Sequence, residues 1–311
     1  MFQLIKPIIF VFISFQLSIL SINTYSEELV DLLEQVNDYD IDKQAAFNVI
    51  ESGGGVYYHE MEAIVPLYPE IIHQEWLEYR SIIAKEIGTV SPLFSKEHMT
   101  WQNSAQSSDE LLRDAKKVSL FFLDFCEKIA TDTDSNTYFG PDNDYLLKSK
   151  SSLLRKIKKD VKRLGTESKA ISIMPDSIRG SIITDSPLNI ARIVAEIKEA
   201  ANEINGKVFF HNYWEEEKQS GYVGVHAKIL FPIKGINSDE ETRYIIAELQ
   251  IHLDCIMDGT PESVKERTHV LYESLRSENH DPVFMSNASK LLFLTALKKY
   301  VSNEHQISIN E

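Results

Sequence analysis

The sequence predicts an α+β protein, in which a small mixed β-sheet is flanked by helices and preceded by a helical N-terminal region. Three observations predict this class. Apolar residues recur at helical spacing in several segments between residues 27 and 130. Three runs between residues 208 and 257 alternate apolar and polar side chains, as half-buried strands do. Residues 145–276 follow the order helix–β–β–helix–β–β–β–helix, which favours one small sheet with helical cover.

The composition is that of an ordinary globular protein. The chain has 311 residues, of which 43% are hydrophobic and 25% are charged, enough for one or two domains. Its formal net charge of −15 disfavours non-specific binding to nucleic acid or to an anionic membrane. The two cysteines, Cys126 and Cys255, exclude a disulfide framework and a CxxC metal pair. We expect two buried thiols. A single disulfide between them, in an oxidising compartment, is the alternative interpretation.

Residues 1–26 have the pattern of an export signal. Lys6 precedes an apolar stretch from Pro7 to Ile22, and small residues follow at 24–26. The stretch is short for a membrane span, so we predict a cleaved signal peptide rather than an uncleaved anchor. The mature chain is then expected to be exported, periplasmic or secreted, without stable membrane insertion.

The N-terminal region, 27–140, is predicted to be helical. Helices are expected at 27–50, at 69–88 with Gly88 ending the helix, and at 107–130 with Ser107 or Ser108 as the N-cap. The polar, turn-rich segment 131–144 separates this region from a second domain at 145–276. Residues 277–311 form a C-terminal helical extension.

The second domain begins with a basic helix. From Lys148 to Lys169 the chain carries nine Lys or Arg and two Asp or Glu, either as a solvated face or as a phosphate-binding surface. Two short β-rich runs follow around Pro175 and Asp176. The remaining elements are a helix at 186–203, strands at 208–214, 222–231 and 244–257, a helix at 260–276 capped by Thr260, and a last helix at 286–303.

The strand 244–253 has two unlike faces. Ala247, Leu249, Ile251 and Leu253 share an apolar face, whereas Glu248, Gln250 and His252 share the other. An antiparallel sheet often has one face in water, which is the simplest explanation of such alternation.

The preceding predicted strand repeats the pattern. Tyr222, His226 and Lys228 share its polar face, and Gly221 and Gly224 leave room beside Tyr222. With Asp176 at the mouth of an earlier strand, one sheet face collects two carboxylates near several Lys and Arg. Carboxylates hold a hard cation and basic residues hold phosphates, so this face is typical of a Mg²⁺–nucleotide site.

At this level of detail, residues 148–273 resemble the synthetase domain of the RelA/SpoT family of alarmone pyrophosphokinases. Five signatures recur in the family's order over roughly 125 residues. They are the basic ATP-binding helix (Lys148, Lys150, Ser151, Lys158), "PDSIRGSIIT" with Asp176, "HNYWEEEKQSGY" with Tyr213, Lys218, Gly221 and Tyr222 followed by His226, "AELQIHL" with Glu248 and Gln250, and "KERTHVLYE" with His269 and Tyr272.

The resemblance implies a Mg²⁺-dependent transfer of pyrophosphate from ATP to a ribose 3′-hydroxyl. It implies that Asp176 and Glu248 are catalytic and hold Mg²⁺, and that Glu248 takes the acceptor's proton. The ATP phosphates would be bound by Lys148, Lys150, Arg155 and Lys158. The acceptor, a GDP- or GTP-like or an adenine nucleotide, would contact Lys218, Tyr222, His226, Gln250 and His252, with Tyr222 stacking on its base.

Several positions depart from the family pattern. His211 and His252 stand where the family has Lys and Arg, Glu217 and Ser220 replace Pro and Asn, and Ser181 lies near a common Arg. Two alternatives therefore stay open: a non-catalytic nucleotide-binding protein that kept the fold, and transfer to the 3′ end of tRNA. Because ATP is scarce outside the cytoplasm, export of an active enzyme indicates a toxin or effector delivered into another cell.

Overall fold

The computed structural model of the chain describes residues 65–66, 69–88, 90, 101–233, 242–260, 263–275 and 281–310. The predicted signal peptide and the predicted helix at 27–50 lie outside these residues. Within them, no helix combines the length and the apolar character needed to cross a bilayer. Cys126 and Cys255 are both free thiols, buried and partly buried respectively.

The described elements are helices and strands in a mixed order. They are α5 (Pro69–Ile87), α6 (Ser108–Asp132), β1 (Asn136–Tyr138), the short 3₁₀ helix η3 (Pro141–Asn143), α7 (Lys150–Leu164), α8 (Glu167–Ser172), β2 (Arg179–Thr184), α9 (Pro187–Glu203), β3 (Lys207–Asn212), β4 (Val225–Ile233), β5 (Arg243–Leu253), α10 (Val264–Leu275) and α11 (Pro282–Asn310).

The five strands form one mixed sheet in the order β1-β2-β5-β4-β3. The pair β2–β5 is parallel, and the pairs β1–β2, β4–β5 and β3–β4 are antiparallel. The predicted class, a small mixed sheet flanked by helices, is therefore confirmed. The register places Arg179 of β2 opposite Glu248 of β5, and His226 of β4 opposite Gln250.

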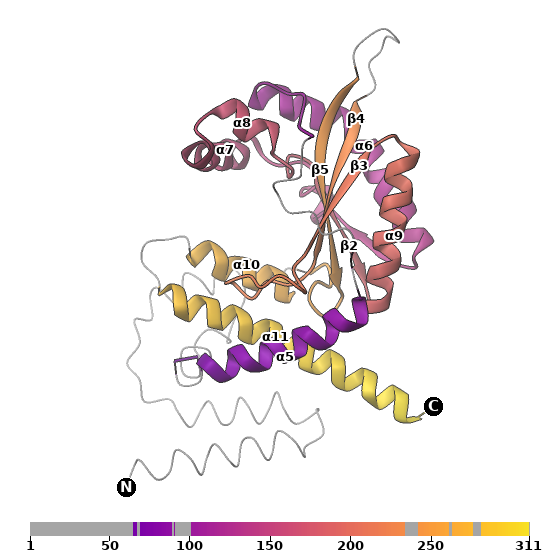
Figure 1. The fold of residues 1–311 in the computed structure, drawn as a ribbon, viewed down its shortest axis with the longest axis vertical. Coiled ribbons are helices and arrows are strands. Elements are labelled where there is room, and N and C mark those ends of the chain that lie inside the picture. Colours follow the sequence, from indigo (N-terminus) through magenta and orange to yellow (C-terminus); the bar gives the residue numbers. More distant parts are fainter. Residues whose placement is uncertain are drawn as a thin grey trace.

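Helices α6 and α9 cover the apolar face of the sheet (Figure 1). Phe231 of β4 makes edge-to-face contacts with Phe122 and Phe125 of α6, at centroid distances of 5.6 and 5.1 Å. Buried residues of α6, together with part of those of α5 and α11, belong to the same hydrophobic cluster as the strands, while other buried residues of α5 and α11 form a second cluster with α10. The helical segments on either side of the predicted second domain therefore pack on its core, and the predicted domain limits stay a prediction.

The other face of the sheet is approached by α7 and α8 toward one end and by α10 toward the other (Figure 1). Helix α7 begins at Ser149, whose hydroxyl accepts a hydrogen bond from the Ser152 N–H (3.3 Å), and it ends at Gly165 with φ +86°. The Ser107 hydroxyl caps α6 in the same way, accepting from the Glu110 N–H at 3.2 Å. These caps fix where each helix starts relative to the sheet.

The structure corrects four details of the sequence prediction. The first β-rich run before Pro175 is the helix α8, which the Thr166 hydroxyl caps. The turn-rich segment contains β1, a strand that exists because it pairs with β2. Tyr222 lies in the loop before β4 rather than on the strand. Helix α10 starts at Val264 and is capped by the Ser263 hydroxyl rather than by Thr260.

Candidate functional site

The candidate site is built on the polar face of β5, between β2 and β4. Residues Glu248, Gln250 and His252 point to this face, as the alternation predicts. The register adds Arg179 from β2 and His226 from β4. The side chains of Glu248 and His226 are only 13% and 14% exposed, so the face is not simply solvated.

Asp176 lies just before β2 and is held by two lysines. Its Oδ2 accepts hydrogen bonds from the ammonium groups of Lys148 at 2.8 Å and Lys156 at 2.6 Å. Burial alone would raise the pKa of the carboxyl, but the charges of Lys156 and Lys148 outweigh it and lower the pKa to about 2. Its Oδ1 is buried and has no hydrogen-bond partner among the described residues. That oxygen is free to bind a cation.

A ring of polar contacts continues from Glu248 to Tyr222. The Gln250 side-chain amide donates to Glu248 Oε1 at 2.8 Å, and Gln250 Oε1 lies 3.3 Å from His252 Nε2. The Tyr222 hydroxyl lies 2.6 Å from His226 Nε2 and 3.4 Å from His252 Nε2. His226 Nδ1 closes the ring at 3.8 Å from Glu248 Oε2.

This ring decides the tautomer of His252. Because Gln250 Oε1 can only accept, His252 Nε2 carries the proton. Its Nδ1 is then a bare acceptor, buried and without a partner among the described residues. A Cβ at Gly224 would lie 3.0 Å from the His252 ring, and the φ of +144° also favours glycine there. The glycine therefore allows the imidazole to pack under the loop.

Both histidines of the ring are neutral at pH 7. Burial lowers the pKa of His226 to about 4, an effect that the Glu248 charge only partly opposes. Burial, followed by the charge of Lys265, lowers the pKa of His252 well below its usual range. Burial also raises the pKa of Tyr222 well above 10. The ring is thus a neutral hydrogen-bonding array around one carboxylate.

The basic side chains of α7 and of the chain before it have two kinds of environment. Lys148, before the helix, and Lys156 of α7 reach Asp176, whereas Arg155 and Lys158 of α7 are exposed. Lys150 pairs with Asp109 of α6 at 2.7 Å. The structure thus places three of the predicted ATP-binding side chains of α7 outside the Asp176 contact. Sequence reasoning missed Lys156, although its position three residues after the buried Leu153 places it beside the inward face of the helix.

The loop between β3 and β4 carries Lys218 and Tyr222. The Lys218 ammonium lies 4.3 Å from the centroid of the Tyr213 ring, and the Tyr222 ring contacts Phe293 of α11 edge-to-face at 6.3 Å. Tyr222 is therefore packed against the core as well as hydrogen-bonded, and is not an open platform.

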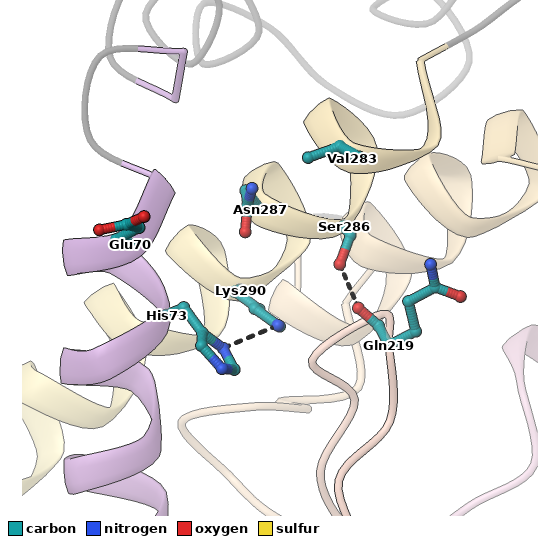
Figure 2. Close-up of a pocket in the computed structure, with 7 residues that line it drawn as sticks. All are labelled: Glu70, His73, Gln219, Val283, Ser286, Asn287 and Lys290. Atoms are coloured by element: carbon teal, nitrogen blue, oxygen red, sulfur yellow. Dashed lines mark hydrogen bonds between the residues drawn. The ribbon is translucent and has the colours of Figure 1, made fainter.

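A cavity of about 320 Å³ lies where this loop meets α5 and α11. Figure 2 shows Lys290 reaching His73, at 2.9 Å, and the Ser286 hydroxyl donating to the Gln219 backbone carbonyl. A Cβ at Gly221 would meet the Lys290 side chain at 2.5 Å. Helices α5 and α11 therefore fix the conformation of the loop that holds Lys218 and Tyr222.

Lys265, at the start of α10, is a further charged residue of the site that the sequence pattern did not reveal. Its backbone N–H donates to the Ile256 carbonyl at 2.9 Å, which ties α10 to the chain leaving β5. Its charge contributes to the low pKa of His226 and His252. The ammonium therefore acts on the same face as Glu248.

The metal-binding capacity of this face is limited to two carboxylates. Among the described residues, no group of three or more His, Cys, Asp or Glu side chains is placed to hold a metal ion. Among the residues that the structure describes, Asp176 Oδ1 has no hydrogen-bond partner and Glu248 Oε2 lies 3.8 Å from His226 Nδ1. Two carboxylates suit a cation that keeps water or phosphate as its other ligands, as Mg²⁺ does.

Comparison of the sequence with protein-family models and with curated proteins gives no match. Among solved structures, the chain is similar to the small alarmone synthetase 1 of Bacillus subtilis, solved with its product pppGpp, at 17% identity and a TM-score of 0.45, over 66% of this chain and 96% of that one. It is also similar to a Streptococcus mutans protein, at 16% identity and a TM-score of 0.43, over 64% of this chain and 90% of that one. A GTP pyrophosphokinase family protein of Streptococcus pneumoniae is similar at 15% identity and a TM-score of 0.39, over 64% of this chain and 88% of that one.

Proposed function

We propose that this protein is a Mg²⁺-dependent pyrophosphokinase that moves the β,γ-pyrophosphate of ATP onto the ribose 3′-hydroxyl of an acceptor nucleotide. The observation that carries the proposal is Asp176, whose carboxylate is bound by Lys148 and Lys156 on one oxygen and left unpartnered on the other. Two ammonium groups beside a cation-binding oxygen match the needs of a polyphosphate with its metal.

The residues present fit a magnesium ion at this position. Asp176 and Glu248 would hold it through Oδ1 and Oε2, the oxygens without a short hydrogen bond. When bound, Mg²⁺ would neutralise charge on the transferring phosphates. Lys148 and Lys156 would bind the ATP phosphates directly, since their ammonium groups already converge on one point.

Glu248 would accept the proton of the acceptor hydroxyl. The Gln250 amide orients its carboxylate at 2.8 Å, and the neutral His226 lies beside it at 3.8 Å. The acceptor 3′-oxygen would attack the β-phosphorus of ATP, the bond from that phosphorus to the α,β-bridging oxygen would break, and AMP would leave. The proton of the hydroxyl would pass to Glu248.

A second candidate is a nucleotide-binding protein without catalysis. One observation favours it: the Tyr222 hydroxyl is bound to His226, and its ring packs against Phe293 instead of standing open for a base. The neutral His252, where the resembled motif has arginine, points the same way. Binding of ATP and of acceptor without transfer would identify this alternative.

The proposed setting is outside the cytoplasm of the producing cell, as a toxin or effector. The support is the N-terminal sequence pattern, with Lys6 before the apolar stretch Pro7–Ile22. N-terminal sequencing of protein recovered outside the cytoplasm should begin near Glu27. A soluble cytoplasmic pool that retains Met1 would contradict this assignment.

The enzymatic proposal is tested with the purified full chain, γ-labelled ATP and Mg²⁺. The acceptors are GDP, GTP, ADP, ATP and tRNA, and labelled products are separated by thin-layer chromatography. We expect a labelled nucleotide and unlabelled AMP, both lost in Glu248→Gln and retained in Lys117→Met, a change on the exposed side of α6. Label released only as pyrophosphate or phosphate, or transfer that survives in Glu248→Gln, would contradict the proposal.

A further inference from the structure

The ammonium group of Lys265 has almost no hydrogen-bond acceptor in its surroundings. Its ammonium is partly buried, and its one hydrogen-bond acceptor within the described ranges is the thioether sulfur of Met257, at 3.3 Å. A thioether is a weak acceptor, and a lysine ammonium has three protons to donate. Burial lowers the pKa of Lys265 to about 8, so the group is still mainly protonated at pH 7.

The groups around Lys265 leave the face short of negative charge. Arg179 adds a second positive charge that acts on Lys265, while Glu248 and Glu266 act on it as anions. His226 and His252 are neutral at pH 7 and contribute no charge of either sign. If Glu248 is engaged by a metal ion, Lys265 and Arg179 are left with Glu266 as the one remaining anion of this set. An incoming anion would then be attracted to this side of the face.

The position of α10 indicates which anion would be bound by Lys265. The cations that converge on Asp176 come from α7 and the chain before it, and α7 and α10 lie toward opposite ends of the sheet (Figure 1). Glu248, the proposed base for the acceptor hydroxyl, lies opposite Arg179, which follows Asp176 at the start of β2, whereas the Lys265 N–H bonds to Ile256 beyond the end of β5. A ligand that reaches Lys265 from Glu248 thus lies toward the end of β5 that α10 follows, near His226 and His252, on which the Lys265 charge acts.

We propose that the Lys265 ammonium, supported by Arg179, binds the phosphate tail of the acceptor nucleotide and makes the site select phosphorylated acceptors over nucleosides. This inference rests on the proposed function, because it takes the acceptor to be a nucleotide. It assigns a ligand to an ammonium that forms no ion pair with any residue that the structure describes.

The test compares Lys265→Met with Lys265→Arg. Methionine has nearly the length of lysine without its charge and removes a desolvated ammonium, so the thermal midpoint should not fall. Arginine keeps the charge. Lys117→Met removes a lysine from the exposed side of α6 and is the matched control.

The measurement is calorimetric binding of guanosine, GMP, GDP and GTP to the full chain, with a non-hydrolysable ATP analogue titrated separately. Wild type should bind more tightly as phosphates are added. Lys265→Met should weaken GDP and GTP binding at least tenfold, the size of one charge-assisted hydrogen bond, and change guanosine and ATP-analogue binding less than twofold. Lys265→Arg should recover most of the loss.

Three results would overturn the inference: equal weakening of guanosine and GDP, weakening of the ATP analogue alone, or wild-type affinity that does not depend on phosphate number. The proposed function fails separately, when wild type shows these binding differences but transfers no pyrophosphate to any acceptor. Failure of wild type to bind any of the nucleotides would remove both proposals.

Discussion

Acidification from pH 7 to pH 5 should destabilise this protein through His226. In the folded state burial holds the pKa of this imidazole at about 4, against about 6.5 in the unfolded chain. The unfolded state therefore binds more protons between these values, and the free energy of unfolding must fall as the pH falls through that window. Below pH 4 both states are protonated and His226 adds no further loss.

The magnitude follows from the two pKa values. At about 1.4 kcal/mol per pKa unit, the full shift is worth about 3 kcal/mol, of which about 2 kcal/mol is lost between pH 7 and pH 5. His252 adds a loss in the same direction, because its pKa is also lowered. Most carboxylates stay ionised above pH 5, so the histidines dominate this window.

Urea unfolding followed by tryptophan fluorescence measures this loss at pH 7 and pH 5, at constant ionic strength. His226→Gln should reduce the pH-dependent loss by about 2 kcal/mol relative to wild type. Ser168→Ala, which changes an exposed side chain of α8 that carries no charge, should leave it unaltered. Equal pH dependence in wild type and His226→Gln would show that the polar face of the sheet is solvated, and the site geometry would be wrong.

Three further outcomes follow from the site. Glu248→Gln should abolish transfer in the labelled-ATP assay at nearly unchanged stability. Asp176→Asn should abolish transfer and also lower the free energy of unfolding in urea by about 3 kcal/mol, because two lysines lose their counter-ion. Wild-type stability of Asp176→Asn would contradict the ion-pair geometry. Lys156→Met should weaken binding of an ATP analogue at least tenfold and more than Lys158→Met, since of these two lysines it is Lys156 whose ammonium pairs with Asp176; the reverse order in titrations would refute this. Tyr222→Ala should weaken acceptor binding by ~1–3 kcal/mol without affecting the ATP analogue if the ring stacks on the base, and unfolding without a selective binding defect would identify Tyr222 as a core residue.

The long periodic elements of the fold could be predicted from the sequence. Helix α9 has its proline at the first position and its apolar stripe, and β5 has its strict alternation, so both are encoded locally. The three-residue strand β1 could not be found, because its residues are polar and become a strand only through pairing with β2. The alternating isoleucines at 171 and 173 resembled a strand, but the Thr166 cap and the burial of Ile171 produce the helix α8.

The residues of the candidate site likewise fall into those that the local sequence predicts and those that it does not. Period-2 alternation was enough to place Glu248, Gln250 and His252 on one face. Lys156 and Lys265 were missed, because a lysine on a helix becomes a site residue only when the helix docks on the sheet. For Lys265 no periodic signal exists, since the backbone bond to Ile256 that positions α10 is a tertiary contact. The polar side chains of a strand can thus be predicted from the local sequence, whereas the lysines that complete the site depend on how the helices pack.

Two charged groups on this face, one negative and one positive, have an atom short of partners, and this bears on what the face binds. Buried polar groups are paired in most proteins, so each unpaired atom needs an explanation. Within the part of the chain that the structure describes, Asp176 Oδ1 has no hydrogen-bond partner, and the Lys265 ammonium has only a sulfur atom as acceptor. A wet surface would leave neither atom short of partners, and a sealed core would not retain both. A metal ion together with the phosphates of nucleotides supplies the cation and the anion at once.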